Sequence, residues 1–272
     1  MTPIIGFADE MKDWFLLIDL VPLKGSLNMA IDEHLFNSLT SEPQTFLRFY
    51  QWERPTASLG YAQKAENALD LKFCRSRGID IVRRMTGGKM VLHHQEITYS
   101  IASSDQELFT ATLGGSYKRI SQALMEGLKK MGLRPSPASK APAFYARGNL
   151  PCFSHPAQDE IEVEGKKIVG SAQKRTANRF LQHGSIPLRH DPALLKSVSL
   201  MKSDTGEIRM TSLRSLLGRE VDFPWAASHL IAGFRDFFKV RLTALTFGDA
   251  DWDQIRDLQK NTYENKAWTF SR

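Results

Sequence analysis

The chain of 272 residues contains only two cysteines, Cys74 and Cys152. A small secreted domain held by disulfides usually carries more, and two cysteines that form no Cys-x-x-Cys pair make a structural zinc site improbable on this sequence. Both are therefore interpreted as free thiols of a protein in the reducing cytoplasm. Cys74 lies in a segment of helical character and is expected to be structural.

Long hydrophobic runs are also absent, since no apolar stretch approaches the roughly 20 residues that span a bilayer. The strongest apolar stretch near the start, residues 14–18, follows Asp9, Glu10 and Asp13 and lacks the basic front of a signal peptide. It is predicted to be a first strand. Because 42% of the residues are hydrophobic and 24% are charged, we expect a folded core and no membrane partner.

Positively charged residues are only in modest excess over negatively charged ones. Lys and Arg number 36 against 30 for Asp and Glu, which gives a formal net charge of +6. This excess favours acidic partners such as nucleic acid or an acidic carrier protein, and basic residues scattered over a solvated surface explain it as well. No dense Lys/Arg block and no nucleic-acid-binding motif occurs, so no nucleic acid partner is predicted.

Helical and strand patterns are mixed without the regular βαβ alternation of a doubly wound sheet, which predicts an α+β fold with a mixed β-sheet core flanked by helices. Strands are expected at residues 45–50, 79–84 and 90–104, with a hairpin formed by 160–163 and 167–172. Helices are expected at residues 27–36 after an N-cap at Ser26, and at 117–133, 225–239 and 251–264. Residues 135–151 are expected to form a loop.

The first candidate site comprises Arg83, Arg84, Thr86, Gly87 and Gly88 at the end of a predicted strand. Glycines at a strand end let backbone N–H groups approach a ligand closely. The two arginines could hold a carboxylate, a phosphate or a thioester carbonyl through charged hydrogen bonds. An ordinary hairpin with surface arginines would have the same sequence, so these residues alone leave both interpretations open.

Two adjacent histidines, His93 and His94, form the second candidate. Paired histidines can bind a metal, but neighbouring residues of a strand face opposite sides, so at most one points into a given site. No metal site is therefore predicted.

The third candidate is the strand that begins at Lys166 and Lys167 and continues through Gly170. The two lysines face opposite sides, and the glycine leaves room for a ligand. A lysine in an apolar tunnel can hydrogen-bond an acyl carbonyl or stabilise an oxyanion. A charged hairpin edge is the alternative interpretation.

Cys152 is the fourth candidate, because it follows a loop and precedes the Lys167 hairpin. Its thiolate could attack a thioester and carry the acyl group as a new thioester, if a nearby lysine or histidine activated it. Free cysteines are more often buried and inert.

Together these segments resemble the lipoate/biotin protein ligase and octanoyltransferase family. The similar stretches keep the family's order over most of residues 26–190, at 28–33, 48–52, 58–63, 83–88, 91–100, 167–173 and 182–186. The resemblance implies a single catalytic domain of the biotinyl/lipoyl-transferase type, which is class II synthetase-like, over residues 1–272. Its motif core would span about 26–190, and a helical segment would span about 220–272.

Within the family, the chain resembles the cysteine-dependent octanoyltransferases, which carry a Cys-Phe pair shortly before the Gly-Lys-Lys hairpin. Here that pair is Cys152 and Phe153, and the end of the chain, residues 262–270, also resembles this branch. ATP-dependent lipoate ligases carry an Asn-Asp pair in this region, whereas Asn149 is followed here by Leu150.

The resemblance implies an octanoyltransferase of lipoate biosynthesis. It would move octanoyl from acyl carrier protein to a lysine of a lipoyl domain, either the glycine-cleavage carrier or a dehydrogenase acyltransferase subunit. Cys152 would form the acyl intermediate, Lys167 would orient its carbonyl, and no cofactor is implied. The implied substrate-binding residues are Arg83, Arg84, Thr86, Gly87, Gly88, His93, Gly170, Ser171, Ala172, His183 and Gly184.

Two other functions stay open at this point. An ATP-dependent lipoate ligase would need ATP and magnesium and would keep Cys152 as a bystander. A non-catalytic partner would bind lipoyl domains without turnover, which the presence of both Lys167 and Cys152 disfavours. A biotin ligase fits less well, because the flanking motifs are closer to those of lipoate enzymes.

Overall fold

The computed structural model describes residues 11–109, 112–138, 160–200 and 210–271. The prediction for Cys152 therefore lies outside the described residues, as does the predicted loop beyond residue 138.

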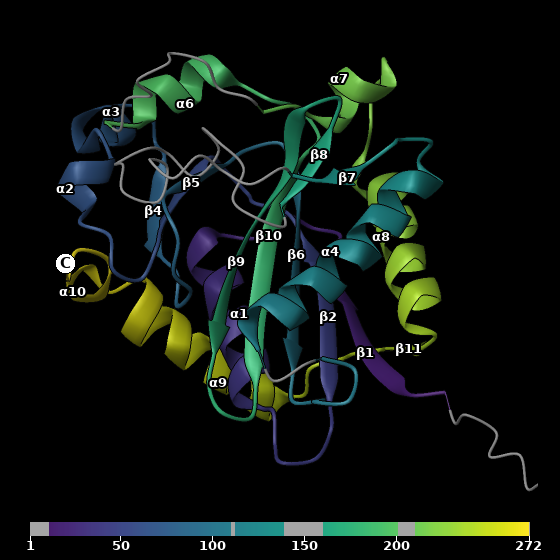
Figure 1. Cartoon of the computed structure of the whole chain (residues 1–272). Coiled ribbons are helices and arrows are strands. Elements are labelled where there is room, and N and C mark those ends of the chain that lie inside the picture. The colour runs from purple at the N-terminus through teal and green to yellow at the C-terminus, as the bar shows by residue number, and fades with distance from the viewer. Residues whose placement is uncertain (1–10, 110–111, 139–159, 201–209, 272) are drawn as a thin grey trace, which may run out of the picture.

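Most strands form one mixed sheet of eight strands in the order β11-β1-β2-β6-β10-β9-β8-β7 (Figure 1). Strand β1 is parallel to both β2 and β11, whereas the other neighbours are antiparallel. The strands are β1 (Asp13–Ile18), β2 (Thr45–Tyr50), β6 (Glu96–Ser103), β7 (Ser136–Pro137), β8 (Ile161–Val163), β9 (Lys166–Arg175), β10 (Phe180–Pro187) and β11 (Arg241–Ala244). The predicted α+β class with a mixed sheet is confirmed.

A second sheet of three strands, β4-β3-β5, lies beside the first (Figure 1). It consists of β3 (Thr56–Leu59), β4 (Asp80–Arg83) and β5 (Val91–His93). The continuous strand predicted over residues 90–104 is therefore wrong, because the chain bends at Gln95, whose φ is 50°. That bend places β5 in the small sheet and β6 in the large one.

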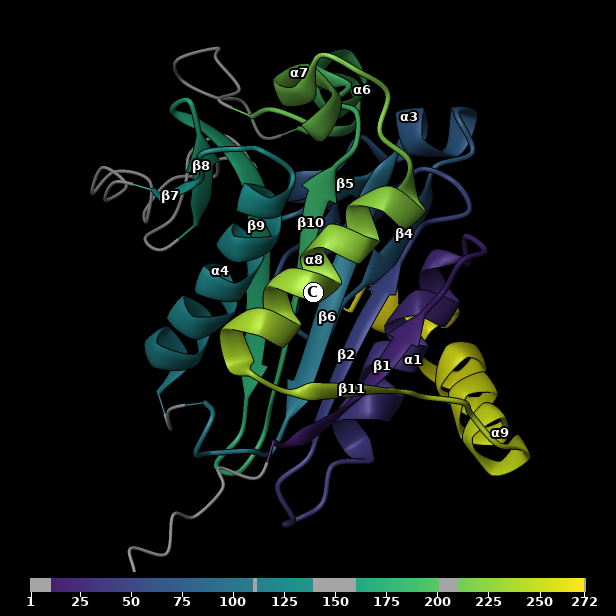
Figure 2. The ribbon, with the colours of Figure 1, turned by 90° about the vertical axis from the view of Figure 1, so that its right-hand side faces the viewer.

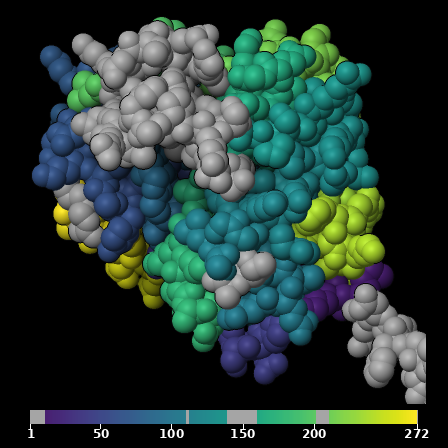
Figure 3. Space-filling model, in the orientation of Figure 1, coloured from purple at the N-terminus to yellow at the C-terminus, as the bar shows by residue number. Residues whose placement is uncertain are grey.

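Helices cover both faces of the large sheet (Figure 2), with α4 and α8 on one face and α1 and α9 on the other. The helices are α1 (Gly25–Asn37), α2 (Ala65–Ala68), α3 (Leu71–Ser76), α4 (Leu113–Lys130), α6 (Pro192–Val198), α7 (Leu213–Leu217), α8 (Phe223–Phe238), α9 (Asp249–Leu258), the π-helical turn η1 (Gln259–Tyr263) and α10 (Lys266–Thr269). Figure 3 shows α4 on one side of the molecule and α2 and α3 on the other. None of the described helices is long and apolar enough to cross a membrane.

Helix α1 does not begin at the predicted cap. Its N-cap is Lys24, which makes no side-chain capping bond, and Ser26 lies inside the first turn. The hydroxyl of Ser26 donates instead to Glu264 at 3.2 Å. The first residue of the helix packs tightly, since a Cβ at Gly25 would lie 2.8 Å from the methyl group of Thr56.

The hairpin prediction is confirmed, with its turn at Glu164 and Gly165. Both residues have positive φ angles, 53° and 70°, as a two-residue hairpin turn of type I′ requires. Strand β9 continues beyond the predicted end and pairs with β10 as far as Arg175. The same pairing of β9 with β10 places residues 170–172 opposite residues 183–185.

The end of β3 packs closely against the glycine segment that follows β4. A Cβ added at Gly60 would lie 1.9 Å from the carbonyl oxygen of Gly88. The backbone N–H of Tyr61 donates to the carbonyl of Thr86 at 2.9 Å. Only a glycine at position 60 allows the two segments to touch in this way.

We predict that Gly60→Ala lowers the free energy of unfolding by about 1–3 kcal/mol, the usual cost of forcing extra atoms into a packed site. Chemical denaturation measures this change. Gly114→Ala is the matched control, because a Cβ there meets nothing within 4 Å and alanine is favoured in a helix. A Gly60→Ala variant as stable as the wild type would contradict the close packing.

Candidate active site

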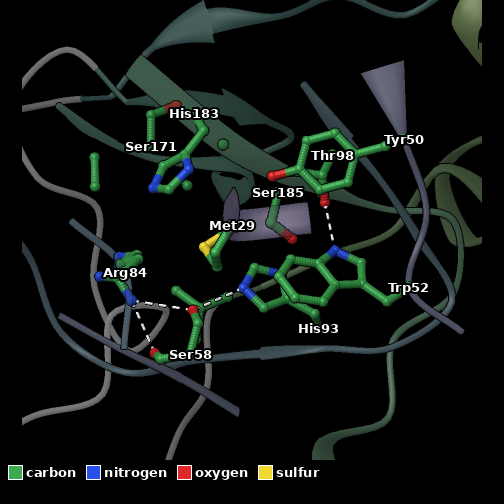
Figure 4. A pocket seen from close by; sticks show the side chains of 14 residues that line it. Met29, Tyr50, Trp52, Ser58, Arg84, His93, Thr98, Ser171, His183 and Ser185 are labelled. Atoms are coloured by element: carbon green, nitrogen blue, oxygen red, sulfur yellow. Dashed lines mark hydrogen bonds between the residues drawn. The ribbon is translucent and has the colours of Figure 1, made fainter. Parts of the chain in front are cut away.

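A cavity lies where the two sheets and α1 meet (Figure 4). Its walls come from β2, β3, β5, β6, β9 and β10, and from the residues that follow β2 and β4. Seven of the predicted substrate-binding residues line it: Arg84, His93, Gly170, Ser171, Ala172, His183 and Gly184. The fold thus brings together segments from three separate parts of the chain, and their role in binding substrate stays a prediction.

Seven further residues line the same cavity and were not singled out from the sequence. They are Met29, Tyr50, Trp52, Ser58, Val91, Thr98 and Ser185. All of them fall within the stretches that carry the family resemblance, so a signal was present. That signal did not say which side chains of a stretch face inward.

Glycine is required at Gly184 by the cavity wall itself. A Cβ at this position would lie 2.5 Å from the hydroxyl of Ser171 and 2.6 Å from the ring of Tyr99. Those two side chains are hydrogen-bonded to each other at 2.7 Å. Burial raises the pKa of Tyr99 to about 12, so its hydroxyl stays protonated.

The first of two polar chains beneath the cavity runs from Arg84 to Asp32. Arg84 Nε donates to Thr86 Oγ1 at 3.1 Å, and that hydroxyl lies 2.7 Å from His183 Nε2. The other ring nitrogen, His183 Nδ1, lies 3.1 Å from Asp32 Oδ2. This chain connects the segment after β4 to β10 and to α1.

The second chain starts at the same arginine and has the same order of groups. Arg84 Nη1 donates to Ser58 Oγ at 3.1 Å, and this hydroxyl lies 2.7 Å from His93 Nε2. His93 Nδ1 lies 2.8 Å from Glu96 Oε1. Glu96 also accepts from Thr98 at 2.5 Å and, through Oε2, from the hydroxyl of Ser185 at 2.6 Å.

The chemistry of the end groups fixes the direction of both chains. A guanidinium only donates and an ionised carboxylate only accepts. Each histidine therefore donates from Nδ1 to its carboxylate and accepts a hydroxyl proton at Nε2. The polar atoms of these two chains therefore bond one another. Figure 4 shows Trp52 stacked on His93, with ring centroids 3.9 Å apart.

For the pair of Asp32 and His183 in the first chain, the pKa shifts agree with this assignment. Burial by itself raises the pKa of Asp32, but the hydrogen bond from His183 and the charge of Arg48 outweigh it, and the net pKa is lowered. Burial lowers the pKa of His183, and Asp32 only partly opposes that shift. His183 is therefore a neutral imidazole beside an ionised carboxylate.

Arg83 is not placed at the cavity, although it was predicted with the binding residues. Its buried guanidinium donates to the carbonyls of Gly60 at 2.8 Å, Gln63 at 2.7 Å and Thr269 at 2.8 Å. Trp268 Nε1 in turn donates to the Arg83 carbonyl at 2.9 Å. Arg83 thus joins the last described helix to the end of β4, which is a structural position.

Gly87 and Gly88 line a surface groove with Tyr61 and Lys174 and are not among the residues that line the cavity described above. Arg84 holds this segment, since its Nη2 donates to the carbonyls of Gly87 at 2.9 Å and Lys89 at 2.7 Å. Thr86 does not line the cavity itself, but it is hydrogen-bonded to His183, which does. The residues of the first candidate site are thus divided between the cavity wall, a surface groove and the structural position of Arg83.

Lys167 is fully buried and also does not line the cavity. Its Nζ donates to Glu160 Oε1 at 2.6 Å. It lies on β9, three residues before Gly170 in the cavity wall. Cys74 is buried in α3, where burial raises the pKa of its thiol, in agreement with the structural role predicted for it.

No three His, Cys, Asp or Glu side chains converge to hold a metal ion among the residues that the structure describes.

Comparison with known proteins identifies the fold and its relatives. Residues 24–235 match the model of the lipoyl protein ligase A/B catalytic domain. The chain belongs to this family. An octanoyltransferase LipM from Carboxydothermus hydrogenoformans is 34% identical and is matched over 96% of this chain and 99% of its own length. An octanoyltransferase LipM from Bacillus anthracis is 35% identical over 91% of this chain and 94% of its own length.

Solved structures of the family share the fold. A lipoate-protein ligase A bound with ATP superposes with a TM-score of 0.82 at 23% identity, covering 95% of this chain and 98% of its own. A putative lipoate protein ligase from Thermoplasma acidophilum with bound lipoic acid gives a TM-score of 0.80 at 22% identity, covering 95% and 99%. At these identities the likeness concerns the fold.

The buried neutral state of His183 makes a prediction about pH. The unfolded chain binds a proton at this residue below about pH 6.5, whereas the folded chain does so only at a lower pH. Stability should therefore fall as the pH decreases from about 6.5 towards the lowered pKa of His183, by at most about 1.4 kcal/mol per pH unit for one proton.

Denaturant titrations between pH 7 and 5 measure this slope in the wild type and in His183→Gln. The variant should show a smaller slope, even if its stability at pH 7 is lower. His94→Gln, at a half-buried histidine outside both chains, is the control for removing an imidazole. An unchanged slope in His183→Gln would mean that His183 is not a buried neutral group.

Proposed function

We propose that this chain transfers octanoyl from an acyl carrier protein to a lysine of a lipoyl domain through an acyl-Cys152 intermediate. The activity itself, octanoyl transfer in lipoate biosynthesis, is that of its relatives along nearly the whole chain. The observation that carries the proposal is the cavity, whose buried polar groups bond one another and leave ring and carbon surfaces for an aliphatic chain.

The proposed reaction has two steps. The Cys152 thiol loses its proton and its thiolate attacks the thioester carbonyl of the donor. A new C–S bond forms, the C–S bond to the carrier breaks, and the carrier leaves as a thiolate that takes up a proton. The neutral ε-amine of the acceptor lysine then attacks the acyl-Cys152. A C–N bond forms, the Cys152 thiolate leaves, and the amine gives up one proton.

Lys167 would donate a hydrogen bond to the carbonyl oxygen in both steps, where negative charge develops. Its place on β9, close in sequence to the cavity wall, supports this role. The cavity would hold the octanoyl tail, with the Gly87 and Gly88 groove beside it. The net charge of +6 would favour an acidic carrier protein.

Because the donor is already a thioester, the proposal needs neither ATP nor magnesium. The related ligase structures, one of which is bound with ATP, support an ATP-dependent lipoate ligase as the alternative function. The sequence favours the transferase, since Leu150 follows Asn149 where the ligases carry an Asn-Asp pair. We place the reaction in the cytoplasm, where reducing conditions keep Cys152 as a thiol.

The acceptor is proposed to be a lipoyl domain. One related structure describes a bipartite lipoate protein ligase and its E2 lipoyl domain from Thermoplasma acidophilum. The glycine-cleavage carrier and the dehydrogenase acyltransferase subunits are the two acceptors to compare.

We predict that octanoyl-carrier protein converts the enzyme to a species heavier by one octanoyl group, and that a lipoyl domain removes this group. Intact-mass spectrometry measures both events. Cys152→Ala should form no adduct and lose roughly 10³-fold or more of the transfer rate. Cys74→Ala, which removes the buried thiol of α3, is the matched control and should still form the adduct.

The same assay separates the alternatives. Transfer should proceed without ATP, and free lipoate with ATP should give no product. Full activity in Cys152→Ala, or a strict need for ATP, would refute the acyl-cysteine route in favour of a ligase. Tight binding of the lipoyl domain without any turnover would indicate a non-catalytic partner.

A further inference from the structure

A second pocket lies outside the cavity described above, at the end of the large sheet where β10 ends. It encloses about 620 Å³, and the two sets of lining residues have no member in common. Figure 2 shows α7, which forms one side of the pocket, beyond the arrowhead of β10. We call it the arginine pocket after the charged side chains that line it, which are Arg189, Arg214 and Arg219 with His190 and Glu220.

Positive charge is in excess in the arginine pocket, because three guanidinium groups face one carboxylate. Glu220 is shared by two of them, since it accepts from Arg189 Nη2 at 2.6 Å and from Arg214 Nε at 2.9 Å. The third, Arg219, lies over the ring of Trp225, with Cζ 4.1 Å from the ring centroid. A guanidinium carries five N–H donors, so one carboxylate cannot saturate this group of arginines.

His190 adds a buried polar atom to the same wall. Its Nε2 is buried and has no hydrogen-bond partner among the residues that the structure describes. A buried polar atom without a partner is unfavourable, so a ligand that bonds it gains free energy on entering the pocket. A neutral imidazole can donate one hydrogen bond to an oxygen atom of such a ligand.

The arginine pocket is close to the cavity along the chain. Ser185 lines the cavity, and Arg189, four residues later, lines the pocket. Four residues of fully extended chain span at most about 14 Å. The backbone N–H of Arg189 donates to the carbonyl of Gln95 at 3.1 Å, and that of Arg214 donates to the carbonyl of Leu188 at 3.1 Å. One long ligand could therefore occupy both places.

We propose that the arginine pocket binds the phosphate group of the prosthetic arm on which the carrier protein holds its thioester. An acyl carrier protein presents its acyl group at the end of a long phosphopantetheine arm, and the phosphate is the only charged group of that arm. Arginine suits this ligand, because its planar fork of donors matches phosphate oxygens. Binding of the phosphate would hold the arm while the thioester end reaches the cavity. The inference rests on the proposed function, in which the donor is an acyl carrier protein.

The test is the double variant Arg214→Gln and Arg219→Gln, compared with the wild type on three donors. These are octanoyl-carrier protein, octanoyl-phosphopantetheine and octanoyl-pantetheine, which lacks the phosphate. We expect KM to rise at least about tenfold for the first two donors with little change in kcat, because only binding of the phosphate is lost. With octanoyl-pantetheine, kcat/KM should be the same in both enzymes. Rates of transfer to a lipoyl domain measure these constants.

The matched control is the double variant Arg235→Gln and Arg256→Gln. It removes the same two charges from exposed arginines that also pair with carboxylates, those of Asp236 and Asp253. Neither arginine lines the arginine pocket. The control should keep the wild-type KM for all three donors. An equal rise of KM in the control would overturn the proposal, because it would reflect the net charge of the protein and not a phosphate site.

Direct binding supplies a readout without turnover. In calorimetric titrations, the wild type should bind phosphopantetheine at least about tenfold more tightly than pantetheine, and inorganic phosphate should compete. The double variant in the arginine pocket should lose this difference. Tighter binding of ATP than of phosphopantetheine, lost in the same variant, would assign the pocket to a nucleotide and overturn the proposal.

The three donors also distinguish the other outcomes. A KM that rises equally for octanoyl-pantetheine would show that the two arginines do not act through the phosphate. A rise for the carrier protein without one for octanoyl-phosphopantetheine would assign the arginines to the acidic surface of the carrier. Either result would overturn the proposal and leave the proposed function standing. Absence of octanoyl transfer by the wild type would count against the proposed function instead, and the titrations would still decide whether the pocket binds the phosphate of the arm.

Discussion

The buried guanidinium of Arg84 is the interaction on which the site depends. It donates hydrogen bonds to two hydroxyl groups. Each hydroxyl group donates in turn to a histidine, which is hydrogen-bonded to a carboxylate. An uncompensated charge of this kind would be unfavourable in the interior. Its donors are matched by side-chain oxygens and by the carbonyls of Ser58, Gly87 and Lys89, so the group costs little and fixes the surrounding segments.

The two chains that begin at Arg84 end in different layers of the fold. One ends at Asp32 on α1, which also binds Arg48 at 2.8 Å and the hydroxyl of Tyr50 at 3.0 Å on β2. The other ends at Glu96, at the start of β6. The position of the cavity wall is therefore set by hydrogen bonds that reach both sheets and α1, and apolar packing of the helices supports that frame from outside.

The network also explains how a cavity rich in histidine, serine and threonine can have a mostly apolar surface. Residue type alone would describe such a wall as polar. Once each hydroxyl and ring nitrogen of the two chains has a partner, the surfaces that remain are aromatic faces, methyl groups and methylenes. Lys167 and Glu160, which form a buried ion pair, are not among the residues that line this space.

The sequence by itself determined the α+β class, the strand over residues 45–50, the hairpin turn at Glu164 and Gly165, and the segments that form the cavity. The class, the strand and the turn follow from local rules of alternation and turn chemistry, whereas the segments of the cavity were identified by their resemblance to a known family. The role of Cys152 also rests on the sequence, since this residue lies outside the described part of the structure.

Only the tertiary structure separated two neighbouring arginines, of which Arg84 reaches the cavity while Arg83 binds the carbonyls around Gly60 and Thr269. It also revealed Ser58, Trp52 and Asp32 around the site and Glu160 beside Lys167. Such pairings join residues far apart in the chain or across a shifted β ladder. Because a strand's pattern gives alternation and not the partner that each side chain meets, no local rule could supply them.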